Sequence, residues 1–93
     1  MASWLLAEAE RPRAGTLVVL ATALLVAEPR HRIREVFRLI WNREGWPVGA
    51  MGFQEWDRMA AVSLGEIVAV DLPGGVHARH RKHVVQIGHN DLA

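Results

Sequence analysis

An amphipathic pattern between residues 29 and 44 constrains the fold of this 93-residue chain more than any other feature. Pro29 suits the first turn of a helix because its missing N–H would be unpaired there, and Gly45 suits the left-handed residue that ends a helix. The sequence therefore predicts a helix from Pro29 to about Glu44 with one face buried against another layer. The apolar positions that recur at helical spacing are Ile33, Val36, Phe37, Ile40 and Trp41.

The remainder of the chain is typical of an α+β domain. A second helix is predicted from about Phe53 to Leu64, with Phe53 on its apolar side. Pro73 and Gly74 fit the central positions of a type II turn, because glycine accepts a positive φ. We therefore predict two main helices packed on a small antiparallel three-stranded sheet. Its strands would be Ile67–Leu72, Val76–His80 and His83–Ile87.

The last two of these strands form a basic hairpin in this prediction. With Arg81 and Lys82 as a two-residue turn, His80 pairs with His83. Since side chains alternate between the faces of a strand, the hairpin then has one apolar and one mainly polar face. The apolar face carries Val76, Ala78, Val85 and Ile87, and the other carries His77, Arg79, Val84 and Gln86.

The N-terminal third is apolar and is predicted as an arm or linker, residues 1–27, in front of a domain formed by residues 28–93. Its longest apolar run, Leu17–Ala27, is shorter than the roughly 20 residues that cross a bilayer as a helix, so no membrane partner is expected. Leu17–Leu20 favours a strand, whereas Ala21–Ala27 favours a helix.

The residue types argue against chemistry within this chain. The absence of cysteine excludes disulfides, zinc–thiolate sites and cysteine nucleophiles, and indicates a cytoplasmic protein. His77 lies on the opposite face from His80 and His83, which are expected to be exposed titrating groups, so no metal site is predicted. Neither a nucleophile–base pair nor a glycine-rich phosphate loop is present, and we predict no catalytic or cofactor-binding residues.

Two groups of cations are the candidate binding residues. Arg30, Arg34 and Arg38 follow each other at four-residue spacing and form one row on the first helix. The hairpin end adds Arg79, Arg81 and Lys82. Cations in such groups bind nucleic-acid phosphates, although both groups are also compatible with ordinary solvated surface. The tryptophans in the helical region, Trp41, Trp46 and Trp56, are expected in the core, with Trp41 and Trp56 packed together.

Two short segments carry a family resemblance that covers roughly residues 28 to 88. They are Arg38-Leu39-Ile40-Trp41 with Gly45-Trp46-Pro47, and Asp71-Leu72-Pro73-Gly74-Gly75. With the order of the helices and strands, they resemble the C-terminal, non-catalytic region of bacterial tRNA(Ile)-lysidine synthases. Those enzymes use ATP to join lysine to a cytidine of the tRNA anticodon loop.

The resemblance implies a tRNA-binding accessory role in the cytoplasm for residues 28–93. The ATP-dependent catalytic domain of the family has no counterpart in this chain, so the chain would be a fragment, a split-gene product or a remnant, inactive alone. An alternative is a small protein-interaction module that docks through its apolar N-terminal third. Burial of that third in the domain core would weaken this alternative.

Overall fold

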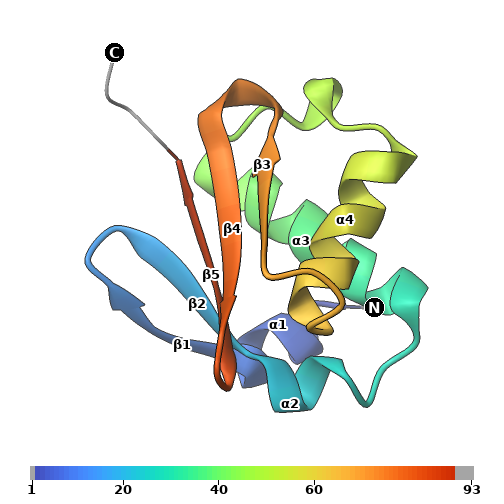
Figure 1. The fold of residues 1–93 in the computed structure, drawn as a ribbon, viewed down its shortest axis with the longest axis vertical. Helices are drawn as coiled ribbons and strands as arrows, with labels where there is room; N and C mark the ends of the chain where they lie inside the picture. Colours follow the sequence, from blue (N-terminus) through green and yellow to red (C-terminus); the bar gives the residue numbers. More distant parts are fainter. Residues whose placement is uncertain (1, 90–93) are drawn as a thin grey trace.

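The computed structural model describes residues 2–89. Residue 1 of the predicted arm (1–27) and residues 90–93 of the predicted domain (28–93) lie outside the described residues. Five antiparallel strands form one sheet in the order β1-β2-β5-β4-β3, and Figure 1 shows the helices gathered on one side of it. The chain order is α1 (Ser3–Ala9), β1 (Glu10–Ala14), β2 (Leu17–Ala21), α2 (Thr22–Leu25), α3 (Arg30–Glu44), η1 (Val48–Ala50), α4 (Phe53–Ser63), β3 (Ala69–Leu72), η2 (Pro73–Gly75), β4 (Val76–Arg81) and β5 (Val84–His89). The α+β class is confirmed.

The sheet is larger than the predicted three strands because the N-terminal third adds β1 and β2 to it. β2 pairs with β5, placing Leu20 beside Val85, and both side chains are fully buried. Strand β1 was not predicted because it is an edge strand with mostly exposed side chains and therefore has no apolar alternation. An edge strand also tolerates a proline such as Pro12. Residues 2–25 therefore supply part of the common core as well as two of the five strands.

The hairpin has the predicted faces with a different register. Arg81 pairs with Val84, so that Lys82 and His83 form the turn, and Lys82 takes a positive φ of 55°. His80 pairs with Val85 rather than with His83. The pairing differs by two residues, an even number, and the apolar face is therefore preserved. Val76, Ala78, Val85 and Ile87 are all buried, as predicted.

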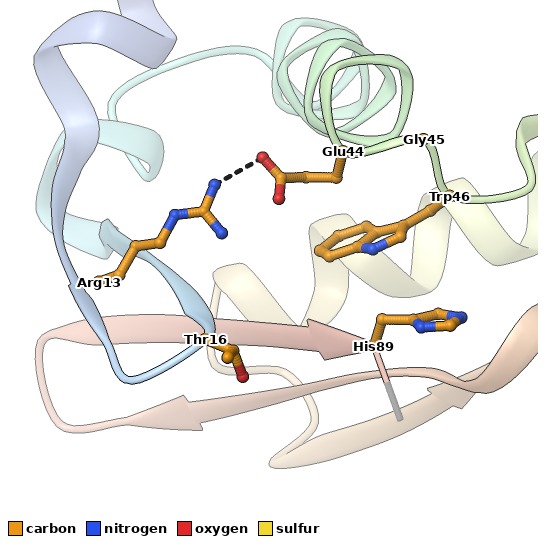
Figure 2. Close-up of a pocket in the computed structure, with 6 residues that line it drawn as sticks. All are labelled: Arg13, Thr16, Glu44, Gly45, Trp46 and His89. Atoms are coloured by element: carbon orange, nitrogen blue, oxygen red, sulfur yellow. Dashed lines mark hydrogen bonds and ion pairs between the residues drawn. The ribbon is translucent and has the colours of Figure 1, made fainter. Parts of the chain in front are cut away.

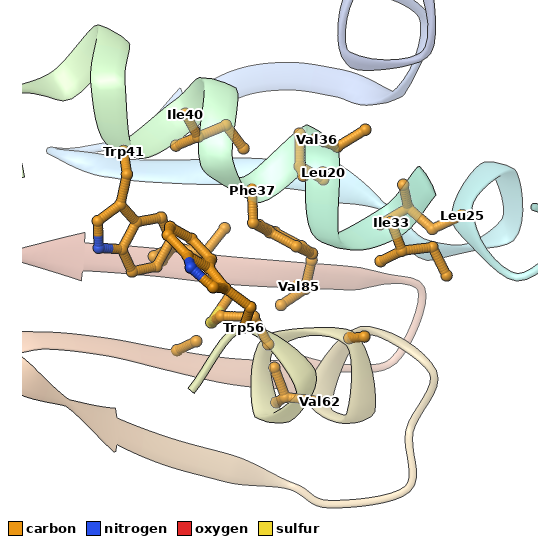
Figure 3. Close-up of a cluster of buried hydrophobic side chains, with 14 of the residues drawn as sticks. Leu20, Leu25, Ile33, Val36, Phe37, Ile40, Trp41, Trp56, Val62 and Val85 are labelled. Carbon is orange, nitrogen blue, oxygen red and sulfur yellow. The ribbon is translucent and has the colours of Figure 1, made fainter. Parts of the chain in front are cut away.

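Helix α3 lies along the sheet and buries the stripe that its sequence predicts. Figure 3 shows Phe37 directed toward the strands and close to Val85, with Leu20 and Val36 nearby. Gly45 ends the helix with φ 74°, the left-handed conformation expected there. Helix α4 packs against α3. Its first residue, Phe53, was predicted on the apolar side of this helix, but it is 67% exposed and lies outside the core.

The two segments that carry the family resemblance lie in contact with each other. Trp41 packs edge-on against both Trp46 and Trp56, with ring centroids 5.1 and 5.3 Å away, which confirms the predicted Trp41–Trp56 contact. Gly74 has φ 79° and ψ 17°, as a type II turn requires at its third residue. A Cβ atom on Gly74 would lie 2.3 Å from Pro47 Cγ. The turn before β4 therefore fits closely on the loop after α3.

Candidate nucleic-acid interface

The end of the β4–β5 hairpin carries three exposed cations, Arg79, Arg81 and Lys82, which we call the hairpin patch. Arg79 alternates along β4 with the buried Ala78, so the two arginines point away from the face that the helices cover. Within residues 2–89, no salt bridge and no side-chain hydrogen bond engages any of the three. Their charges are therefore directed to solvent or to a ligand.

The hairpin patch borders a cavity of about 530 Å³ on the open face of the sheet. Gln86 adds an amide group to this surface, and Val84 adds the one fully apolar side chain. Arg79 and Gln86 face each other across the β4–β5 pair, and they lie on the same face. The complete lining is Arg79, His80, Arg81, Lys82, Val84 and Gln86.

His80 connects the hairpin to helix α4 and is half-buried rather than exposed as the sequence suggested. Its ring Nδ1 lies 2.9 Å from the carbonyl oxygen of Val62, and its backbone N–H donates to the carbonyl of Val68 at 2.8 Å. A carbonyl oxygen can only accept, so Nδ1 carries the hydrogen of this bond. His83 remains exposed at the turn, as expected.

The arginine row of α3 is largely paired within the protein. Arg30 Nε donates to Asp57 Oδ1 at 2.8 Å and Arg30 Nη1 donates to Glu66 at 2.8 Å, while Arg34 Nη1 reaches the same Asp57 oxygen at 3.2 Å. The hydrogen bond from Arg30 holds the pKa of Asp57 below its ordinary value, and the same pairing raises the pKa of Arg30. Arg38 differs, since its guanidinium lies 5.1 Å from the Trp56 ring centroid and no acid within residues 2–89 pairs with it.

Apart from Arg38, which lies against Trp56, the predicted contact residues therefore fall into two separate settings. Arg30 and Arg34 hold α3 against α4 through Asp57, whereas the hairpin patch has no internal partner in the described chain. A phosphate would compete with a carboxylate at Arg30 but not at the hairpin patch. The geometry thus favours the patch over Arg30 and Arg34 as the place where an anion binds.

A second cavity, of about 370 Å³, lies where the β1–β2 hairpin meets the end of α3. Figure 2 shows Arg13 reaching across to Glu44, with Trp46 and His89 on the other side. Arg13 Nη2 donates to Glu44 Oε2 at 2.6 Å, and this hydrogen bond lowers the pKa of Glu44. Because the charges of Arg13 and Glu44 satisfy each other, we interpret the pair mainly as a link between β1 and α3.

No pattern in the sequence indicates this link, because Arg13 and Glu44 are 31 positions apart and neither belongs to a recognisable motif. Arg43 strengthens it by donating to Glu10 at 2.7 Å and to Glu44 at 2.9 Å. These pairs join two elements that only the fold brings together. The same holds for Arg30 and Asp57, which are 27 residues apart.

Other kinds of site are not assembled in the part of the chain that the structure describes. Between residues 2 and 89, no three histidine, aspartate or glutamate side chains cluster as ligands for a metal ion. In the same range, none of the helices combines the length and the apolar character that crossing a membrane requires. Comparisons with family models, curated proteins and solved structures found no match to this chain.

Proposed function

We propose that this chain binds tRNA through the hairpin patch, as the non-catalytic accessory part of an ATP-dependent ligase similar to tRNA(Ile)-lysidine synthase. The observation that carries the proposal is the group Arg79, Arg81 and Lys82, exposed on one hairpin and without an acidic partner in residues 2–89. Unpaired cations of this kind dominate the affinity of proteins for nucleic-acid backbones.

The form of the surface also suits RNA. A-form RNA exposes phosphates and 2′-hydroxyls, and proteins recognise it mostly by shape and backbone contacts. The hairpin patch offers cations for phosphates, and Gln86 offers both a donor and an acceptor to a 2′-hydroxyl. Contacts of this kind position an RNA without reading its bases, which is what an accessory domain beside a separate catalytic domain requires.

Binding of unmodified tRNA by the purified chain, followed by fluorescence anisotropy across a salt series, tests the proposal. We expect a dissociation constant in the micromolar range or tighter at low salt, which weakens steeply as salt increases. Binding should be similar for tRNAs of different sequence. A chain that is folded by circular dichroism and yet binds no tRNA at low salt would refute the proposed function.

A second candidate, a protein-interaction module, is supported by one set of exposed apolar side chains. Trp4 on α1 is 50% exposed, and Leu24 and Val26 in the region of α2 are also exposed. Other apolar residues of the N-terminal third, including Leu20 and Leu25, are buried in the core and cannot dock on a partner. Co-purification of a protein that is lost on Trp4→Ala would favour this candidate over RNA binding.

A further inference from the structure

The seam between α3 and α4 carries a second surface that suits RNA, formed by aromatic rings and arginines. The guanidinium of Arg34 lies 4.8 Å from the centroid of the Phe53 ring, and that of Arg38 lies 5.1 Å from the centroid of Trp56. Arg34 and Arg38 are one helical turn apart on α3, and Phe53 and Trp56 are neighbours at three-residue spacing on α4. The two cation–π pairs therefore lie side by side.

Phe53 stands out in this arrangement because its ring is 67% exposed while Trp56 is buried. Its backbone position is set by the start of α4. Phe53 is the first residue of α4, and the N–H of the preceding Gly52 donates to the Glu55 carboxylate at 2.7 Å. The Arg34 contact further restrains the ring. The helix thus holds a large aromatic ring in solvent at a defined place.

We infer that Phe53 is a stacking site for an unpaired nucleobase, with Arg38 placed to bind the adjacent phosphate. This inference rests on the proposed RNA-binding function and names the part of the RNA that this seam takes. Proteins hold single-stranded bases by stacking them on aromatic rings and arginine planes beside cations that contact the backbone. Phe53 supplies the exposed ring, and Arg38, which lies one helical turn from Arg34 and has no acidic partner in residues 2–89, supplies the cation in the neighbouring pair.

The charges around Phe53 favour RNA over an apolar protein surface. Asp57 is already neutralised by Arg30 and Arg34, and Glu55 is engaged by the Gly52 N–H. Arg38, in the neighbouring pair with Trp56, thus remains as a cation without an acidic partner in residues 2–89, and it attracts a polyanion to this seam. A docking surface for a protein would be expected to continue into further exposed apolar side chains, but one turn along α4 from Phe53 lie the buried Trp56 and the charged Asp57.

The test uses two probes of equal length, an unstructured oligoribonucleotide that contains 2-aminopurine and a fully paired RNA duplex. We expect Phe53→Ala to weaken binding of the single strand by about five- to a hundredfold and to abolish quenching of 2-aminopurine fluorescence. Duplex binding should not change. Phe53→Trp should restore both signals because it keeps a ring, whereas Phe53→Leu should not. Trp4→Ala, which removes an exposed aromatic from another element, is the matched control and should bind like the unaltered chain.

Each contrary outcome has a separate meaning. If the unaltered chain binds neither probe, both the proposed function and the stacking site are refuted. If it binds the single strand and Phe53→Ala binds equally well, only the stacking site is refuted, and the exposed ring is left as a docking point for a protein. Full binding by Phe53→Leu would also refute stacking, since it would show that apolar area rather than a π-face is needed. Thermal unfolding of each variant confirms that it is folded.

Discussion

The N-terminal strand β2 belongs to the core, so truncating Leu20 should destabilise the whole domain. The Leu20 side chain is fully buried and faces the same layer as Phe37 and Val85 (Figure 3). Leucine-to-alanine changes at such sites cost about 2–5 kcal/mol, through lost burial and the cavity left behind. A chain of this size has a total stability of about 5–14 kcal/mol. Leu20→Ala should therefore remove a large fraction of it.

Urea unfolding followed by tryptophan fluorescence measures this loss, since the three packed tryptophans report on the α3–α4 region and not on β2 itself. A loss of 2 kcal/mol or more should lower the melting temperature by at least about 8 °C. Leu24→Ala is the matched control, because Leu24 lies only four residues away but is 37% exposed; it should cost less than about 1 kcal/mol. Equal, small losses for both variants would refute the reasoning and leave residues 1–27 as a separable arm.

Three further predictions concern the charged groups and the hairpin turn. Asp57→Asn should lower stability by about 0.5–1 kcal/mol in urea unfolding and should tighten tRNA binding, because it frees Arg34 and leaves Arg30 paired only with Glu66; weaker tRNA binding would contradict this. In the folded protein the pKa values of Glu44 and Asp57 lie below their ordinary values of 4.5 and 3.8. The ion pairs of these two carboxylates therefore stabilise the fold fully above the ordinary values, and this stabilisation is lost as pH falls through the lowered pKa values of the folded state. The free energy of unfolding should accordingly decrease on acidification below about pH 4.5, and a flat profile between pH 5 and pH 2 would count against it. Lys82→Gly should leave the melting temperature unchanged or raise it, since glycine accepts the positive φ of this residue at little cost; a clear decrease would argue against the turn described.

The sequence predicted those helices and strands in which buried apolar residues recur at regular helical or strand spacing. The stripe on α3 and the alternation in the hairpin both place apolar residues on one face, and both are confirmed. The even shift in the hairpin register explains how its faces were correct although its turn was not. Strand β1 could not be predicted in this way, because an exposed edge strand has no apolar period to detect.

The candidate site was predictable only in part, for a related reason. The sequence identifies Arg30, Arg34 and the hairpin cations equally well, because it shows charge and spacing along the chain. It does not show that Asp57 and Glu66 fold back onto Arg30, since that pairing depends on how α4 crosses α3. The sequence also placed Phe53 on the apolar side of the second helix, because an aromatic residue at helical spacing is usually buried, whereas the structure leaves it exposed.

The most direct test of the account compares the salt dependence of tRNA binding between two double variants. Arg79→Gln/Arg81→Gln removes two cations from the hairpin patch, and Arg32→Gln/Arg58→Gln removes two from α3 and α4. Each phosphate contact contributes about 0.7–0.9 to the slope of log K against log salt. We predict that the first variant loses about 1.4–1.8 from the slope and binds more weakly at every salt concentration, while the second stays close to the unaltered chain. Equal losses in both variants would mean that only net charge matters, and would contradict the hairpin patch as the RNA-binding site.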